Sequence, residues 1–214
     1  MGASHGLRLG VLASGRGSNL QAICDAIEGG RLPARVSLVL SDREDAPALE
    51  RAREHGAPAA FVDPKAHADR QAYERALLGA LAAEAVDLVC LAGFMRVLGR
   101  TFVDAFRGRL MNVHPSLLPA FPGLHAQRQA LEHGVKLAGA TVHFVDAGID
   151  TGPIILQDAV PVLAGDTEAS LSARILTVEH RLYPEAIGLF AAGRLRVEGR
   201  RVVIAPPPPG SARS

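Results

Sequence analysis

The first half of the chain alternates short apolar runs with segments of helical spacing. An apolar run over 7–14 is followed by a glycine-rich turn and then by a stretch, 20–28, whose apolar positions recur at helical intervals. The same pattern predicts strands at 36–40, 60–62 and 88–92 and helices at 46–55 and 71–83. Buried strands that alternate with helices are typical of a parallel sheet.

The pattern becomes less regular after Gly93. Thr141 and His143 alternate with apolar neighbours, which predicts a strand exposed on one face. Proline lacks the N–H of the helical ladder, so we expect the long helix near the C-terminus to be interrupted at Pro184. The elements expected here are a strand at 110–113, an irregular loop at 115–123, a helix at 126–133, strands at 140–145 and 154–162 around a second loop, a helix at 168–190 and a hairpin at 194–204.

These elements predict one Rossmann-like α/β domain over residues 1–204, with a mostly parallel sheet, helices on both faces and a C-terminal hairpin. The proline-rich residues 205–214 are expected to form a flexible tail. A chain of 214 residues with 48% hydrophobic and 21% charged side chains has ordinary globular composition. No apolar stretch is long enough to span a bilayer and no secretory signal pattern opens the chain, so we expect no membrane association and a cytoplasmic location.

Charge and cysteine content narrow the function classes. The 23 basic and 22 acidic residues leave a net charge of +1, which favours a small substrate over a nucleic acid. Cys24 and Cys90 are far apart and lack metal-ligand spacing, so both are expected to be buried thiols. The histidines show no paired helical spacing either, and we predict no metal.

Gly17, Ser18 and Asn19 form the turn between the first strand and its helix. Backbone N–H groups and the helix dipole converge on an anion at such a turn. Leu20 stands where the dinucleotide fingerprint has its third glycine, and no P-loop lysine follows. On this motif alone, a phosphate site and an ordinary helix start both remain open.

Asn112 and His114 are the candidate catalytic residues, because a strand places positions two apart on one face. An amide donor beside an imidazole suits acyl transfer, in which negative charge grows on a carbonyl oxygen. Asp150, in a turn with Gly148 and Thr151, is the carboxylate expected to raise the pKa of His114. The alternative is that His114 is one of eight histidines with a structural role and that Asp150 merely forms its turn.

Six segments carry a resemblance to a known family, in order and in one register. They are LASGRGSNLQAI at 12–23, LAGFMR at 91–96, NVHPSLLP at 112–119, FPGLH at 121–125, VHFV at 142–145 and IDTGP at 149–153. Together they resemble the glycinamide ribonucleotide formyltransferase family over residues 7–193. Arg16 and Thr151 are the only departures that we note, and neither carries an assigned role.

The resemblance implies transfer of a formyl group from the co-substrate 10-formyltetrahydrofolate to the amine of glycinamide ribonucleotide, a step of purine biosynthesis. It makes His114 the general acid, with Asn112 and Asp150 completing a catalytic trio, and it implies no metal. Gly17, Ser18 and Asn19 would bind the substrate phosphate and Glu179 its ribose. The implied folate-binding residues are Arg70, Met95, Arg96, Val97, Leu98, Asn112, Asp146, Ala147, Gly148 and Ile149.

Three alternatives remain. Methionyl-tRNA formyltransferase is similar through the Asn-x-His-Pro segment, but it needs an additional domain, and we expect none after Ile204. Formyltetrahydrofolate deformylase needs a domain before Leu7, where only six residues stand. A non-catalytic nucleotide-binding module would use the glycine turn alone. A homodimer is possible and the sequence does not decide it.

Overall fold

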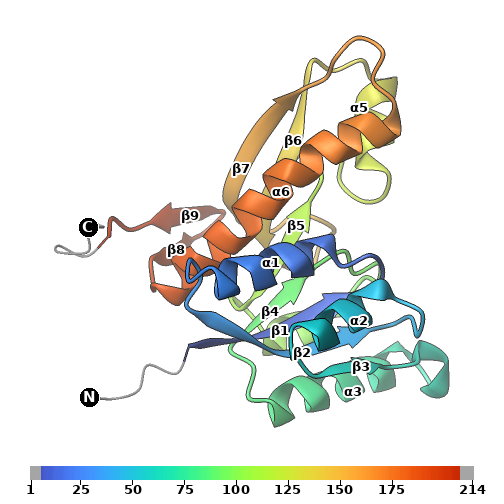
Figure 1. The fold of residues 1–214 in the computed structure, drawn as a ribbon, viewed down its shortest axis with the longest axis vertical. Coiled ribbons are helices and arrows are strands. Elements are labelled where there is room, and N and C mark those ends of the chain that lie inside the picture. The colour runs from blue at the N-terminus through green and yellow to red at the C-terminus, as the bar shows by residue number, and fades with distance from the viewer. Residues whose placement is uncertain (1–5, 208–214) are drawn as a thin grey trace.

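The computed structural model of the chain describes residues 6–207, so the predicted tail at 205–214 lies mostly outside the described residues. Strands and helices alternate through the first half, as predicted (Figure 1). The elements are β1 (Leu7–Ala13), α1 (Ser18–Glu28), β2 (Ala34–Ser41), α2 (Pro47–Glu54), β3 (Ala59–Phe61), the 3₁₀ helix η1 (Pro64–Ala66), α3 (Arg70–Ala83), β4 (Leu88–Leu91), α4 (Arg100–Ala105), β5 (Leu110–His114), α5 (Ala126–Glu132), β6 (Leu137–Phe144), β7 (Ile154–Pro161), α6 (Glu168–Ala191), β8 (Leu195–Glu198) and β9 (Arg201–Ile204).

All strands of the described chain join one nine-stranded sheet in the order β3-β2-β1-β4-β5-β6-β7-β9-β8. The five strands from β3 to β5 in this order run parallel. β6 is antiparallel to both β5 and β7, and β8 and β9 form the predicted C-terminal hairpin. The sheet is therefore mostly parallel, which confirms the predicted fold class.

The sheet is covered on both faces, because successive strand residues point to opposite sides. Leu88 and Cys90 of β4 belong to one core, which includes residues of α1, α2 and α6. Val89 and Leu91 belong to a second core, built with α3 and α4. Figure 1 shows α1, α2 and α6 together on the viewer's side of the sheet. Both cysteines are buried, as predicted.

The long C-terminal helix corrects one prediction. α6 runs without interruption from Glu168 to Ala191 and contains Pro184. Proline removes one hydrogen bond of the ladder, but the residues around it are packed into the core: Tyr183, Ala186 and Ile187 are fully buried. Tertiary packing holds the helix together where local propensity predicted a break.

The prediction of a half-exposed strand at 140–145 was also wrong. Every residue of β6 from Ala138 to Phe144 is buried, including Thr141 and His143. Thr141 donates a hydrogen bond to the carbonyl of Ser116 at 2.6 Å, so the polar face of β6 lies against the loop after β5 rather than against water. The short helices η1 and α4 were not predicted. Within residues 6–207, no helix combines the length and apolarity needed to cross a bilayer.

Candidate active site

The candidate residues gather where the parallel strands end. The sheet order reverses between β1 and β4, because β2 and β3 extend to one side of β1 whereas β4 and β5 extend to the other. Ligands of open α/β sheets bind at such a reversal, outside the carboxyl ends of the strands. Ser14, just after β1, accepts a hydrogen bond from the N–H of Met95, just after β4, at 2.9 Å. The two turns therefore frame one site.

The turn after β1 requires glycine at position 17. Gly17 is the N-cap of α1 with φ +73°, and no side chain caps this helix end. A Cβ at this position would lie 2.8 Å from the Cα of Ala48, so α2 leaves no room for a side chain. The first N–H groups of α1 therefore have no intrahelical partner, as the binding of an anion requires.

Asn19 links this turn to α6. Its Nδ2 donates a hydrogen bond to Oε2 of Glu179 at 2.7 Å, across 160 positions of sequence. Both side chains are buried. Burial raises the pKa of the Glu179 carboxyl to about 7, although the hydrogen bond from Asn19 acts in the opposite direction. The predicted phosphate and ribose residues are thus neighbours, and their carboxyl titrates near neutral pH.

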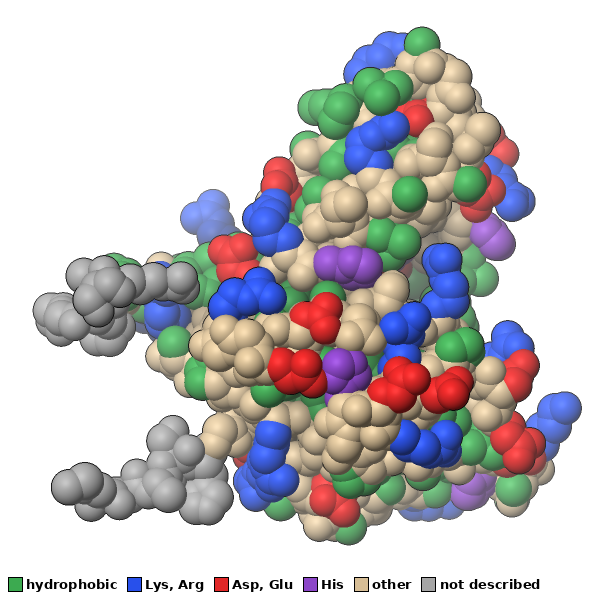
Figure 2. Space-filling model, viewed as in Figure 1, with side chains coloured by type: hydrophobic (Ala, Val, Ile, Leu, Met, Phe, Trp, Pro, Cys, Tyr) green, Lys and Arg blue, Asp and Glu red, His purple; other side chains and the backbone are tan. Residues whose placement is uncertain are grey.

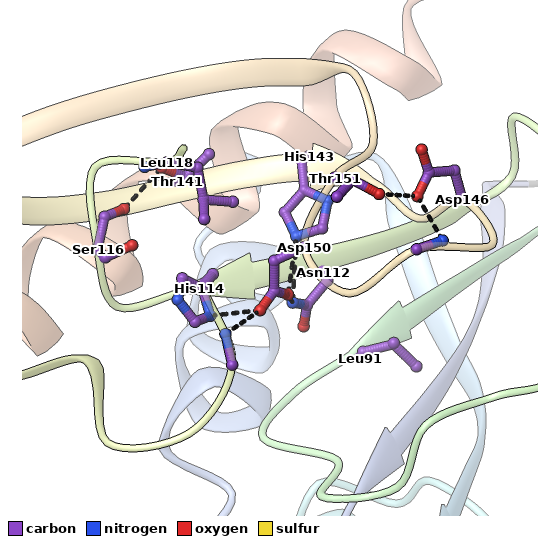
Figure 3. Close-up of polar contacts among 12 residues, drawn as sticks. Leu91, Asn112, His114, Ser116, Leu118, Thr141, His143, Asp146, Asp150 and Thr151 are labelled. Atoms are coloured by element: carbon purple, nitrogen blue, oxygen red, sulfur yellow. Dashed lines mark hydrogen bonds and ion pairs between the residues drawn. The ribbon is translucent and has the colours of Figure 1, made fainter. Parts of the chain in front are cut away.

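The three predicted catalytic residues meet at the end of β5 (Figure 3). Nδ1 of His114 lies 3.3 Å from Oδ2 of Asp150, and Nδ2 of Asn112 lies 3.4 Å from Oδ1 of the same carboxylate. Asn112 and His114 point the same way from one strand, as the two-residue spacing predicted. Asp150 reaches them from the loop after β6, in a left-handed backbone conformation with φ +52°.

His114 corrects the prediction about its charge. Burial lowers the pKa of the imidazole below its usual value and outweighs Asp150 and the Phe121 carbonyl, both of which favour the charged form. The carboxylate acts in the expected direction but does not prevail, because the ring is almost fully enclosed. Nε2 of His114 lies 2.9 Å from the Phe121 carbonyl. Both ring nitrogens therefore face acceptors, and only the imidazolium can donate to both.

Asp150 is held as an anion. Burial alone would raise the pKa of this carboxyl, but His143, the backbone N–H of Gly123 and His114 together hold it below its usual value. The Gly123 N–H donates to Oδ2 at 2.8 Å. The loop after β5 thus binds both His114, through Phe121, and Asp150, through Gly123, and fixes the pair relative to each other.

His143 is the neighbour to which the sequence analysis assigned no role. Its Nδ1 lies 2.9 Å from the Phe144 carbonyl, so in the neutral ring the proton belongs on Nδ1 and Nε2 is an acceptor. Nδ2 of Asn112 lies 3.2 Å from that Nε2. The pairing of β5 with β6 places Asn112 directly opposite His143. A polar residue between the apolar Val142 and Phe144 was the available signal.

The predicted folate residues fall into two groups. A cavity of about 410 Å³ is lined by Asp42, Arg70, Tyr73, Glu74, Met95, Arg96, Val97 and Leu98. The remaining predicted residues, Asp146 to Ile149, form a separate loop in which Asp146 accepts hydrogen bonds from Gly148 N–H and the Thr151 hydroxyl. Asp42, Tyr73 and Glu74 were not predicted, although Asp42 directly follows a strand that ends at this edge of the sheet. Within residues 6–207, no group of three or more His, Cys, Asp or Glu residues is arranged to hold a metal ion.

Known proteins share this arrangement. Residues 7–187 match the formyl transferase family model. The chain is 50% identical to phosphoribosylglycinamide formyltransferase of Escherichia coli, over 87% of this chain and 88% of that one. It is 49% identical to the trifunctional purine biosynthetic protein adenosine-3 of Drosophila pseudoobscura, covering 88% of this chain but only 14% of that protein.

The fold agrees with the sequence relationship. The crystal structure of glycinamide ribonucleotide transformylase 1 from Symbiobacterium toebii superposes with a TM-score of 0.93 at 62% identity, covering 95% of this chain and 96% of that one. With a family match over most of the chain and a relative of similar length at half identity, the chain belongs to the phosphoribosylglycinamide formyltransferases of the formyl transferase family.

Proposed function

We propose that this protein transfers the formyl group of 10-formyltetrahydrofolate to the amine of 5-phosphoribosyl-glycinamide, giving the N-formyl product in purine biosynthesis. The observation that carries the proposal is the meeting of Asn112, His114 and Asp150 at one edge of the sheet, beside the turn that Asn19 joins to Glu179. Family membership supplies the reaction class, and the family's co-substrate is the formylated folate.

In this reaction the amine nitrogen attacks the formyl carbon, and the bond from that carbon to N10 of the folate breaks. One proton leaves the amine and one proton reaches N10, so no oxidant or reductant is needed. Negative charge grows on the formyl oxygen in between. His114 and Asn112 are the N–H donors available to this oxygen.

Asn112 can redirect one of its donors to that oxygen. Its two contacts, 3.2 Å to His143 and 3.4 Å to Asp150, are at or beyond the long end of the hydrogen-bond range. Such contacts in a substrate-free site exchange readily for a better-placed acceptor. Asp150, held as an anion, favours positive charge on His114 as proton transfer proceeds.

The binding roles follow the same edge of the sheet. The free N–H groups of Gly17, Ser18 and Asn19 hold the substrate phosphate, and Glu179 contacts the ribose. The cavity beside Arg70 and Met95–Leu98 holds the folate, and the loop Asp146–Ile149 covers its pterin. The apolar side chains of this cavity suit a flat, partly apolar ring.

Small molecules are the proposed partners. Basic and acidic side chains are interspersed on the face shown in Figure 2, and the net charge is only +1, which supports small substrates over a nucleic acid. A cytoplasmic location, a single domain over residues 1–204 and a metal-free reaction are parts of the same proposal. A homodimer remains possible.

A three-way assay tests the proposal. The purified protein receives 10-formyltetrahydrofolate with glycinamide ribonucleotide, with water alone, or with methionyl-tRNA, and loss of the formyl donor is followed by absorbance. We expect rapid loss only with glycinamide ribonucleotide, together with formylated product. Donor loss in water alone would indicate a deformylase, and formylation of the tRNA would indicate the tRNA enzyme. No loss in any arm would leave the non-catalytic alternative.

A further inference from the structure

The cavity beside Met95–Leu98 contains two arginines, each paired with a buried carboxylate. Nε of Arg96 lies 2.9 Å from Oδ2 of Asp42, whose side chain is 9% exposed. Nε of Arg70 lies 3.5 Å from Oε1 of Glu74, which also accepts the Gly99 N–H at 2.7 Å. Both guanidinium groups remain open to solvent, at 46% and 63% exposure.

Asp42 and Tyr73 fix the guanidinium of Arg96 from two directions. Asp42 binds the inner nitrogen, Nε, and the Tyr73 ring lies 5.6 Å beneath the central carbon of the group. This contact leaves the two terminal nitrogens for another acceptor. Two parallel N–H groups on a fixed plane match the geometry of a carboxylate.

The burial of Asp42 distinguishes it from an ordinary surface partner. Its Oδ1 is buried and has no hydrogen-bond partner among residues 6–207, and the same holds for the Tyr73 hydroxyl. An unsatisfied buried carboxylate oxygen is costly. In contrast, Asp45 pairs with Arg43 while 74% exposed, as a typical surface ion pair does.

We propose that Asp42 is a positioning residue that orients the Arg96 guanidinium to receive the anionic glutamate end of the folate co-substrate. The inference rests on the proposed function of this cavity. Folate carries a pterin, an aminobenzoyl group and a glutamate with free carboxylates, and only the glutamate end matches a forked cation. Asp42 does not touch this ligand, because its contact is with Nε.

The test compares two formyl donors that differ only in the glutamate: 10-formyltetrahydrofolate and 10-formyltetrahydropteroate. For Asp42→Ala we expect KM for the glutamate-bearing donor to rise about tenfold, equivalent to about 1.4 kcal/mol. KM for the donor without glutamate, and kcat with either donor, should stay within about twofold, because the chemical step is unaffected. Asp42→Asn keeps an acceptor for Nε and should raise KM by only about threefold, since the neutral hydrogen bond is weaker.

Asp45→Ala is the matched control, since it removes a carboxylate three positions away from an exposed pair. Thermal melting of each variant checks that it folds. An unchanged or lower KM in Asp42→Ala, or an equal rise for both donors, would overturn the role of Asp42. If the wild-type protein itself does not discriminate between the donors, the assignment of the cavity to the folate fails, and the role of Asp42 fails with it.

Discussion

Replacing Glu179 with glutamine tests how strongly burial acts at the edge of the proposed substrate site. Glu179 is 5% exposed, and its one hydrogen bond comes from Asn19. Glutamine has nearly the same shape, and its Oε1 can still accept from Asn19. The substitution therefore removes the titrating proton while it keeps the packing and the contact.

The magnitude follows from the pKa. Burial raises the pKa of Glu179 from its ordinary 4.5 to about 7 in the folded protein. Each pH unit between these values is worth about 1.4 kcal/mol, so the rise amounts to about 3 kcal/mol. Between the two values the folded state binds more protons than the unfolded state, so stability falls as pH rises. The contribution of this residue is most favourable below pH 4.5 and is lost above about pH 7.

The assay is urea unfolding of the wild type and of Glu179→Gln at several pH values between 5 and 8, chosen to cover about that window. We expect the difference in unfolding free energy, variant minus wild type, to grow by an amount on the order of 2–3 kcal/mol across this range. Glu185→Gln is the control, because Glu185 lies on the same helix with its side chain 51% exposed. Parallel stability curves for wild type and Glu179→Gln would refute the reasoning.

Three further predictions concern the catalytic residues and the turn after β1. His114→Ala should lower kcat by a factor on the order of 10²–10⁴ while equilibrium binding of both substrates is retained, because the donor acts on the transition state; unchanged turnover in steady-state assays would remove its role. Asp150→Asn should lower kcat and move the limb of the pH–rate profile that reports His114 to lower pH, because the carboxylate raises the pKa of this imidazole; an identical profile would leave Asp150 structural. Gly17→Ala combines a left-handed φ with a Cβ 2.8 Å from Ala48, and should cost about 1–3 kcal/mol in unfolding free energy and weaken binding of glycinamide ribonucleotide; wild-type melting and affinity would contradict this.

Much of the fold could be predicted from the sequence, because its parallel half consists of strands whose apolar runs are continuous. β1, β2 and β4 are buried on both faces, and the pattern identifies such strands directly. The errors arise where tertiary contacts outweigh local preference. Pro184 stays within a helix because its neighbours are packed into the core, and α4 has only six residues, too few to show a clear helical period.

The site divides in the same way. Asn112 and His114 could be predicted from their spacing, because two residues apart on a strand means one face. Asp150 followed only as an expectation, since nothing in its turn specifies which histidine it approaches. His143 and Asp42 depend on strand register and on the position of a neighbouring turn, and neither is encoded in local spacing. A histidine within an apolar strand predicts burial but not its partner.

Burial also decides which groups of the site carry charge during the proposed reaction. It lowers the pKa of His114 and raises the pKa of Glu179, so both are driven toward their neutral forms. Asp150 is held as an anion, because three neighbouring donors outweigh the effect of its burial. An amine that attacks the formyl carbon gains positive charge, and the formyl oxygen gains negative charge. A fixed carboxylate beside the first and neutral N–H donors beside the second suit this separation of charge, whereas a permanent imidazolium would already be neutralised by Asp150 before the substrates arrive.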